Sequence, residues 1–384
     1  MTISRTKPVK ILHLASFSGN IGDTANHSGF YMKLASIFKT KITQLEIRKF
    51  YLNRSEAKFD NTFIDLVNNF DLLVLGGGGF FDLKWDYSHT GTTINLSAKM
   101  IRKIKIPVLV NAMGYHEYNP INSNNISKFH NFLKEITNND KWFITLRNDG
   151  SFGRMKKRYG NIVDTISVVP DNGFAYHPGV YDKLSIDKLK TTWIGLNITN
   201  ELFSNKINVD TFNKNISLFI NELLSKNNAY KIILFPHAYQ DIVTIGKIIA
   251  EISDKFLRER IIIAPLLNSK ISIEHVFDLY RICTCVVAMR FHGNVCCLAM
   301  NVPTIGLSGH DQISALYDEL GIPERCIRIS TTNLVKKLET IVAETIYNQR
   351  YIKRKYASIH KDLDKLTNTY MKNIRKFVEQ NIYE

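Results

Sequence analysis

The chain has 384 residues, of which 45% are hydrophobic and 22% are charged. This is enough apolar material for a large core, the length favours two domains, and the ordinary charged fraction excludes wholesale disorder. No run approaches the ~20 apolar residues of a membrane-spanning helix. The polar, basic segment Met1–Lys10 is unlike a signal peptide, so we expect a cytoplasmic protein.

The formal net charge of +15 favours anionic partners. The charge is dispersed, with a local excess in Thr345–Glu384, where nine Lys/Arg stand against four Asp/Glu. That excess is not the unbroken basic run of a nucleic-acid tail. The cysteines lie in apolar segments and show no zinc-type spacing with histidine, so we expect buried thiols and no metal site. They are Cys283, Cys285, Cys296, Cys297 and Cys326.

The first 176 residues alternate apolar strand patterns with helical patterns. Val9–Ser16 reads as a buried strand that runs into Gly19-Asn20-Ile21-Gly22-Asp23 and then into a helix over Gly29–Phe38. Further strands are expected at Asp71–Leu75, Ile106–Asn111, Lys141–Leu146 and Val168–Val169. The alternation predicts a parallel, doubly wound sheet in a first domain over 1–176.

A polar stretch with Pro178 and Gly179 is expected to form a linker over 177–190. A second domain over 191–345 repeats the pattern. Its strands are expected at Trp193–Asn197, Lys231–Phe235, Ile261–Ala264, Thr284–Ala288 and Thr304–Leu307. Over 346–384 apolar residues recur every three or four positions, which predicts an amphipathic, basic helix, packed either across the first domain or on its own domain. The predicted fold class is α/β, with two Rossmann-like domains facing across a cleft.

Motifs in the first domain follow predicted strands, where open α/β sheets bind ligands. The turn Gly19–Asp23 brings backbone N–H groups and a helix N-terminus towards an anion, or is a plain tight turn. The run Gly76–Gly79, followed by Phe80-Phe81-Asp82, has too high an entropy cost for a simple turn and indicates backbone close to a ligand or a facing domain. Arg147, which opens Arg147–Ser151, can grip a carboxylate or phosphate, or pairs with a structural acid such as Asp171.

Motifs in the second domain are richer in proton-transfer groups. His237 ends a strand four residues before Asp241 and is either a proton carrier, a hydrogen-bond donor to phosphate, or a structural histidine. Met289–Gly293 is the sharpest signal, because Arg290 supplies a permanent cation, His292 an imidazole and Gly293 a close backbone approach before an apolar helix over Asn294–Met300. This suits an anionic substrate undergoing proton transfer. The segment Ser308–Gln312 ends the next strand and should line the same cleft.

From about Ile11 to about Ile322, this ordered set of motifs resembles the polysaccharide pyruvyl transferase family. The resemblance rests on Gly19–Asp23, Gly76–Gly79 with Phe81-Asp82, Arg147–Ser151, Pro170-Asp171, His237 with Asp241, and Arg290-Phe291-His292. It implies a fold similar to the GT-B glycosyltransferases. It also implies transfer of a pyruvyl group from phosphoenolpyruvate to two hydroxyls of a sugar in a cell-surface polysaccharide, such as a capsule or exopolysaccharide, or in its precursor. The products would be a cyclic ketal and phosphate.

The resemblance places the family's donor-binding arginines and histidine on Arg147, Arg290 and His292, while similar members often carry a lysine where this chain has Gln312. We expect donor contacts from Arg147, Arg290, Ser151, Gly293, Ser308 and Gln312. We expect the acceptor, on the side of the first domain, or the cleft wall to involve Asn20, Asp23, Gly77, Gly78, Asp82 and Asp241. His292 and His237 are the catalytic candidates, and which of them carries the proton stays open. No cofactor or metal is required if arginines and a helix N-terminus stabilise the charge.

Two rival classes stay open. A GT-B-type glycosyltransferase with a nucleotide-sugar donor would need a base and ribose pocket in the second domain, which the sequence does not identify. A non-enzymatic nucleic-acid-binding protein is suggested by charge alone, without a binding motif or a basic–aromatic platform. The expected partners are phosphoenolpyruvate and a glycan acceptor, not nucleic acid. Whether the acceptor is lipid-linked, and whether the protein associates with an anionic membrane at its inner face, stays open.

Overall fold

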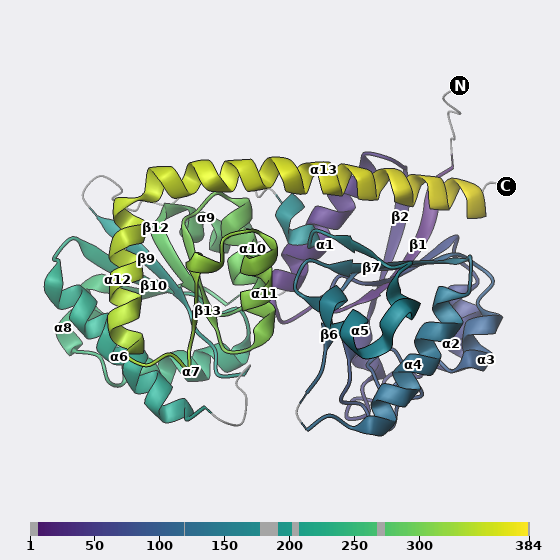
Figure 1. The fold of residues 1–384 in the computed structure, drawn as a ribbon, viewed down its shortest axis with the longest axis horizontal. Helices are drawn as coiled ribbons and strands as arrows, with labels where there is room; N and C mark the ends of the chain where they lie inside the picture. The colour runs from purple at the N-terminus through teal and green to yellow at the C-terminus, as the bar shows by residue number, and fades with distance from the viewer. Residues whose placement is uncertain (1–6, 119, 177–190, 202–206, 267–272, 383–384) are drawn as a thin grey trace. The chain divides into compact units, whose positions relative to one another are not determined.

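The computed structural model describes residues 7–118, 120–176, 191–201, 207–266 and 273–382. The chain divides into two compact units (Figure 1). Unit 1 comprises Met1–Phe17, Phe30–Asn172 and Leu363–Glu384, and unit 2 comprises Ser18–Gly29 and Gly173–Asp362. None of the helices in the described ranges is long and apolar enough to cross a membrane.

Unit 1 is built on a parallel six-stranded sheet with the order β2-β1-β3-β5-β7-β8. The strands are β1 (Val9–Ala15), β2 (Thr40–Glu46), β3 (Leu72–Gly76), β5 (Val108–Met113), β7 (Trp142–Arg147) and β8 (Ser167–Val169). The inner strands are almost wholly buried, as expected when helices cover both faces of a parallel sheet. A short parallel pair, β4 (Phe81–Asp82) and β6 (Tyr115–His116), follows β3 and β5 along the chain.

Alternate strand residues of unit 1 enter two separate apolar clusters, one on each face of the sheet. Helices α4 (Ser123–Thr137) and α5 (Ser151–Tyr159) contribute to one cluster, and α2 (Asn61–Val67) and α3 (Ala98–Lys103) complete this side. The other cluster receives the end of α1 (Ile21–Ala35) and the end of α13 (Gln349–Ile382). Short 3-10 turns lie at Ile47–Phe50, Gly160–Val163 and Asn172–Ala175.

Unit 2 repeats this architecture with the strand order β11-β10-β9-β12-β13-β14. The strands are β9 (Thr192–Asn197), β10 (Tyr230–Leu234), β11 (Ile261–Ile263), β12 (Cys283–Ala288), β13 (Thr304–Ser308) and β14 (Cys326–Arg328). The helices are α6 (Val209–Lys226), α7 (Tyr239–Ile249), α8 (Asp254–Arg260), α9 (Ile273–Ile282), α10 (Phe291–Ala299), α11 (Asp311–Glu319) and α12 (Leu334–Tyr347). A 3-10 turn lies at Pro323–Arg325.

The predicted α/β class with parallel sheets is confirmed, and each strand expected from the sequence is found within a few residues of its predicted limits. Two strands of the six-stranded sheets were missed, as was the short pair β4 and β6. The edge strand β2 has a half-exposed, polar sequence, and β14 has only three residues. The helix expected at Gly29 begins instead at Ile21, directly after the glycine turn, because Ile21 and Ala25 are buried in the core of unit 2.

The units differ from the sequence ranges 1–176, 191–345 and 346–384. The segments 18–29, 173–176 and 346–362 belong with unit 2, and the last 22 residues belong with unit 1. In that last segment Tyr370, Met371 and Ile374 pack into the core of unit 1, and the Tyr370 hydroxyl donates to Asn111 Oδ1 at 2.8 Å. The expected linker 177–190 lies outside the described residues.

Candidate active site

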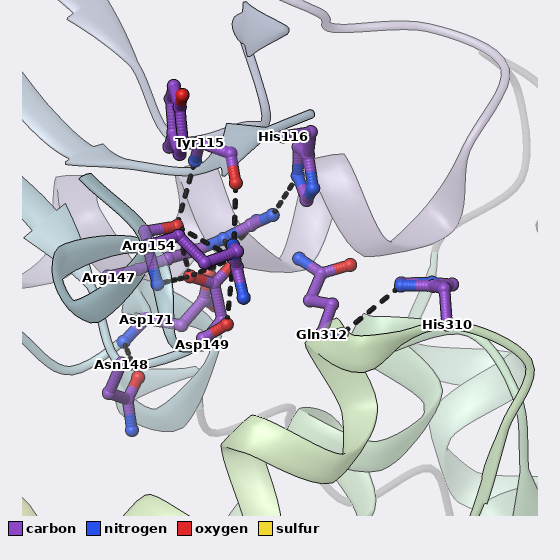
Figure 2. Close-up of polar contacts among 10 residues, drawn as sticks. Tyr115, His116, Arg147, Asn148, Asp149, Arg154, Asp171, His310 and Gln312 are labelled. Carbon is purple, nitrogen blue, oxygen red and sulfur yellow. Dashed lines mark hydrogen bonds and ion pairs between the residues drawn. The ribbon is translucent and has the colours of Figure 1, made fainter. Parts of the chain in front are cut away.

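Arg147 ends β7 in unit 1 and is buried among carboxylates. Its Nε donates to Asp149 Oδ2 at 2.7 Å, and its Nη1 lies 3.8 Å from Asp171 Oδ2 (Figure 2). Its Nη2 lies 3.5 Å from His116 Nε2. The sequence left open whether Arg147 binds a ligand or pairs with a structural acid. The ion pairs show that Arg147 pairs with structural acids, and ligand binding by Arg147 stays a proposal.

Two glycines lie close to Arg147 and its neighbour His116, and a side chain in place of either glycine would collide with one of them. A methyl group on Gly114 would lie 2.6 Å from Arg147 Nη2, and one on Gly79 would lie 2.7 Å from His116 Nε2. Gly76 and Gly77 adopt φ values of 106° and 83°, which favour glycine. The glycine run therefore accommodates a sharp turn and the side chains of its own unit.

Asp149 organises the loop that follows Arg147. Its Oδ1 accepts hydrogen bonds from the Ser151 backbone and hydroxyl, and Ser151 Oγ in turn accepts one from Tyr115 N. Arg154 donates to the carbonyls of Tyr115 and Asp149 and to Ser151 Oγ (Figure 2). Burial raises the pKa of Asp149, but the charges of Arg147, His116 and Arg154 and the Ser151 hydrogen bond outweigh burial and hold it below its usual value. Asp149 is thus an ionised anchor, and Ser151 is committed to the same network.

Three residues expected to line the acceptor side or the cleft, Asp82, Gly77 and Gly78, make hydrogen bonds within unit 1. Asp82 Oδ1 accepts from Thr93 Oγ1 at 2.6 Å and from Thr93 N at 3.1 Å, and Asp82 Oδ2 accepts from Trp85 Nε1 at 2.7 Å. Gly77 N donates to the Asn111 carbonyl, and the Gly78 carbonyl accepts from Gly114 N. Asp82 therefore orders the loop that follows it.

In unit 2, Arg290 stands between β12 and α10 and is clamped by two acids. Its Nε donates to Asp241 Oδ2 at 3.0 Å, its Nη2 donates to Asp241 Oδ1 at 2.6 Å, and Nη2 also pairs with Glu201. The hydrogen bonds that the Arg290 guanidinium makes with described residues use Nε and Nη2, and none of them uses Nη1. Burial raises the pKa of Asp241, but the hydrogen bond and charge of Arg290 outweigh it, so the net shift is downward.

His237 is a buried neighbour of this clamp. Its backbone N–H donates to Asp241 Oδ2 at 2.9 Å, and its Nε2 lies 2.6 Å from the Tyr280 hydroxyl. Its Nδ1 has no hydrogen-bond partner within the described ranges. Burial lowers the pKa of His237 to about 3, with the charges of Arg290 and His292 acting in the same direction and Asp241 opposing them. The ring is therefore neutral at pH 7.

His292 lies in the first turn of α10, and this turn packs closely against its neighbours in unit 2. A methyl group on Gly293 would lie 2.9 Å from Asn197 Oδ1, which also accepts from Arg290 N at 2.9 Å. The turn Gly19–Asp23 belongs to the same unit, and there the Asn20 side chain accepts from Gly22 N at 2.9 Å. Asp23 lies in the first turn of α1.

The segment after β13 is arranged by short-range contacts. Ser308 Oγ donates to the His310 carbonyl at 2.6 Å. Gln312 N donates to His310 Nδ1 at 3.2 Å, and this hydrogen bond caps α11 (Figure 2). Ser308 and Gln312 are buried. The candidate residues are divided between the units, with Arg147, Ser151, Gly77, Gly78 and Asp82 in unit 1 and the others in unit 2.

Sequence reasoning missed several residues that contact these candidates. Glu201, Asn197 and Tyr280 contact Arg290 or His237, and His116 and Arg154 complete the Arg147 network. Asn197 could have been suspected because it ends a buried strand, but nothing near Glu201 or Tyr280 marks them. Within the described ranges, groups of three or more His, Cys, Asp or Glu residues that could hold a metal are absent. Four of the five cysteines are buried and Cys326 is half-buried.

A family model for polysaccharide pyruvyl transferase matches residues 20–311. The match spans most of the chain and residues of both units. The fold defines an α/β protein of two parallel-sheet units. The family match makes it an enzyme of the transferase class, and the chain belongs to the polysaccharide pyruvyl transferase family. The predicted family is thus confirmed. No curated protein shows a significant sequence match.

Solved structures with the GT-B-type fold are similar to the whole chain. Anabaena Alr3699/HepE, solved with UDP and glucose, has a TM-score of 0.56 and 10% identity over 97% of this chain and 100% of its own. The UDP-forming α,α-trehalose-phosphate synthase of Burkholderia vietnamiensis has a TM-score of 0.55 and 9% identity over 97% and 98%. S. aureus MnaA with UDP has a TM-score of 0.53 and 10% identity over 91% and 90%. At such low identity the similarity establishes two Rossmann-like domains, as predicted, and only the fold.

Proposed function

We propose that this enzyme transfers a pyruvyl group from phosphoenolpyruvate to two hydroxyls of a sugar in a polysaccharide or its precursor. The observation that carries the proposal is the buried Arg290–His292 turn at the carboxyl end of β12, inside the residues matched by the family model. Ligands of open α/β sheets bind at this end of the strands.

The reaction has a simple balance of bonds and protons. A proton adds to the methylene carbon of phosphoenolpyruvate, which becomes the methyl group of the ketal. The two sugar oxygens each form a bond to the central carbon, and the bond from that carbon to the phosphate oxygen breaks. The two hydroxyls release two protons, so one replaces the proton used at the methylene carbon and the other leaves with phosphate. The enzyme must therefore supply one general acid and accept protons from two hydroxyls.

His292 is the better candidate for this proton transfer. Imidazole suits proton transfer near neutral pH, and His292 lies in the first turn of α10, where N–H groups favour a developing negative charge. His237 is neutral at pH 7 because burial lowers its pKa to about 3, so it is unsuited to donate a proton there. With Tyr280 O–H donating to Nε2, the His237 ring would carry its proton on Nδ1 and could donate a hydrogen bond to a donor oxygen.

Arg290 would bind the anionic donor through Nη1 while Asp241 and Glu201 fix the other guanidinium nitrogens. A group held this rigidly is pre-organised to meet charge in the transition state. Arg147, with the Ser151 loop, is the corresponding candidate in unit 1, and Gly293, Ser308 and Gln312 remain proposed donor contacts.

The test is phosphate release from phosphoenolpyruvate with a panel of glycan acceptors, lipid-linked and free, and with UDP-sugars as rival donors. Release that depends on phosphoenolpyruvate and on an acceptor, with a pyruvate ketal in the product, is expected. His292→Asn should lower turnover by about 10²–10⁴-fold while donor affinity changes far less. Sugar transfer from a UDP-sugar without phosphoenolpyruvate would instead support a glycosyltransferase, and a larger turnover loss in His237→Asn would reverse the two histidine roles.

A further inference from the structure

We propose that Gly22 is a positioning residue for His292, and that the turn Gly19–Asp23 acts on the reaction through this contact. The inference rests on the proposed role of His292 as proton carrier. The proposal gives the turn a role in the active site of unit 2, although the chain before Ser18 and the chain after Gly29 both belong to unit 1.

The backbone of Gly22 lies directly against the His292 imidazole. A methyl group on Gly22 would overlap His292 Cβ and would lie 2.5 Å from both Cγ and Nδ1 of the ring. Gly22 is helical and has no unusual φ, so the reason for glycine here is the space taken by the ring and not backbone conformation. Alanine would otherwise be favoured at this position by about 1 kcal/mol.

Packing and a hydrogen bond hold the start of α1, the helix that carries Gly22, in place against His292. Ile21 and Ala25 flank Gly22 on α1 and are buried in the same apolar cluster as Cys296 and Cys297 of α10. The Asn20 side chain accepts from Gly22 N and so fixes the start of the helix. A shift of α1 away from α10 would therefore open a cavity between these apolar side chains.

The first turn of α10 is equally restrained on its other sides. Gly293 lies so close to Asn197 that a methyl group there would be 2.9 Å from Asn197 Oδ1. Asn294 Nδ2 donates to the carbonyls of Ala288 and Arg290 at 3.0 and 2.9 Å, and its Oδ1 accepts from the Tyr317 hydroxyl at 2.8 Å. The overlap includes His292 Cβ, which side-chain rotation does not move, so added volume at position 22 must shift residue 292 within this restrained turn and carry its imidazole with it.

Displacement of the imidazole should reduce turnover more than donor binding. A misplacement of about 1 Å can cost about 10²-fold in rate, because proton transfer requires aligned groups at hydrogen-bond distance. Donor affinity should change less, because the Arg290 guanidinium is held separately by Asp241 and Glu201. The expected signature is a fall in kcat with a small change in KM.

The experiment compares Gly22→Ala with Gly246→Ala. Gly246 is a helical glycine of unit 2 with open space where its methyl group would lie, and it is exposed. Turnover with phosphoenolpyruvate is measured beside the His292 imidazole resonance in ¹³C-histidine-labelled protein, assigned by its loss in His292→Asn. Gly22→Ala should lower kcat by at least about tenfold and shift the resonance, whereas Gly246→Ala should change neither.

A stability cycle keeps the contact testable if Gly22→Ala folds poorly. His292→Gly removes the whole side chain, so Gly22→Ala should lower Tm in the His292 protein and leave it unchanged or higher in the His292→Gly protein. An equal loss of Tm in both backgrounds, an unchanged resonance, or a shifted resonance with normal kcat would each overturn the proposal. If the wild-type protein releases no phosphate from phosphoenolpyruvate, the proposed function fails, while the resonance and the cycle still decide whether Gly22 positions His292.

Discussion

His237 offers a direct prediction about stability because it is a buried, neutral histidine. Burial lowers its pKa to about 3, whereas a histidine in an unfolded chain titrates near 6.5. Between these two pH values the unfolded chain binds a proton at this position and the folded chain does not. Stability contributed by the neutral ring is therefore complete above about pH 6.5 and is lost progressively as the pH falls towards 3.

The size of the effect follows from this difference. Each pH unit inside the window should cost about 1.4 kcal/mol of unfolding free energy for one proton. Between pH 7 and pH 5 the loss attributable to His237 is therefore about 2 kcal/mol, a large part of the stability of an ordinary domain. His237→Gln removes the titration and keeps an amide that can meet the Tyr280 hydroxyl.

Urea unfolding at a series of pH values from 7 to 5 would measure this effect in unit 2. The chain has three tryptophans, of which Trp193 lies in unit 2, so a Trp85→Phe/Trp142→Phe background makes fluorescence report on that unit. In this background the protein with His237 should lose about 2 kcal/mol more than the His237→Gln protein over this range. Parallel pH profiles for the two proteins would refute the neutral state of His237 and, with it, the argument against His237 as the acid.

Three further predictions concern binding, packing and location. Arg147→Ala and Arg290→Ala should each weaken phosphoenolpyruvate binding by about 2–4 kcal/mol, with only partial rescue by lysine, and unchanged calorimetric affinity in both alanine variants would contradict the assignment. Tyr370→Phe removes a buried hydroxyl that donates to Asn111, and should lower the unfolding free energy of unit 1 by about 1–3 kcal/mol, whereas exposed Tyr351→Phe should not. The basic helix α13 should bring the protein to anionic vesicles in flotation at low salt, with about 1 kcal/mol per Lys or Arg near the surface; equal flotation with neutral vesicles, or none with either, would count against it.

The sequence was informative about the sheets because inner strands of a parallel sheet are continuous apolar runs. β3 and β12 were found in this way, and their ends located the Gly76–Gly79 run and the Arg290 turn. β2 gave a weak signal because it is an edge strand with polar, half-exposed residues. The start of α1 was missed because the polar residues after Ile21 hide the burial of Ile21 and Ala25.

The candidate site was only partly predictable because its contacts join distant segments. The arginines were identified by their position after strands, and Asp171 was named as an alternative partner of Arg147. No local pattern could reveal that Glu201 meets Arg290, since that pairing depends on how the loop after β9 folds. The need for glycine at position 22 likewise depends on the place of the His292 ring, so the sequence predicted a ligand-binding or plain turn instead.

Arg147 and Arg290 are held in the same way, by two carboxylates each, and this pairing affects how they would bind an anion. In each unit an arginine lies at or just after the end of a strand, and its Nε donates to a fully buried aspartate, at 2.7 Å for Arg147 and 3.0 Å for Arg290. Each guanidinium also has a second carboxylate partner, so its positive charge is largely neutralised before a ligand arrives. The free energy of binding must then come from N–H groups in fixed directions, which cost little reorganisation. The net charge of +15 therefore acts mainly through exposed side chains, where salt screens it, so added salt should slow association with an anionic donor more than it speeds dissociation.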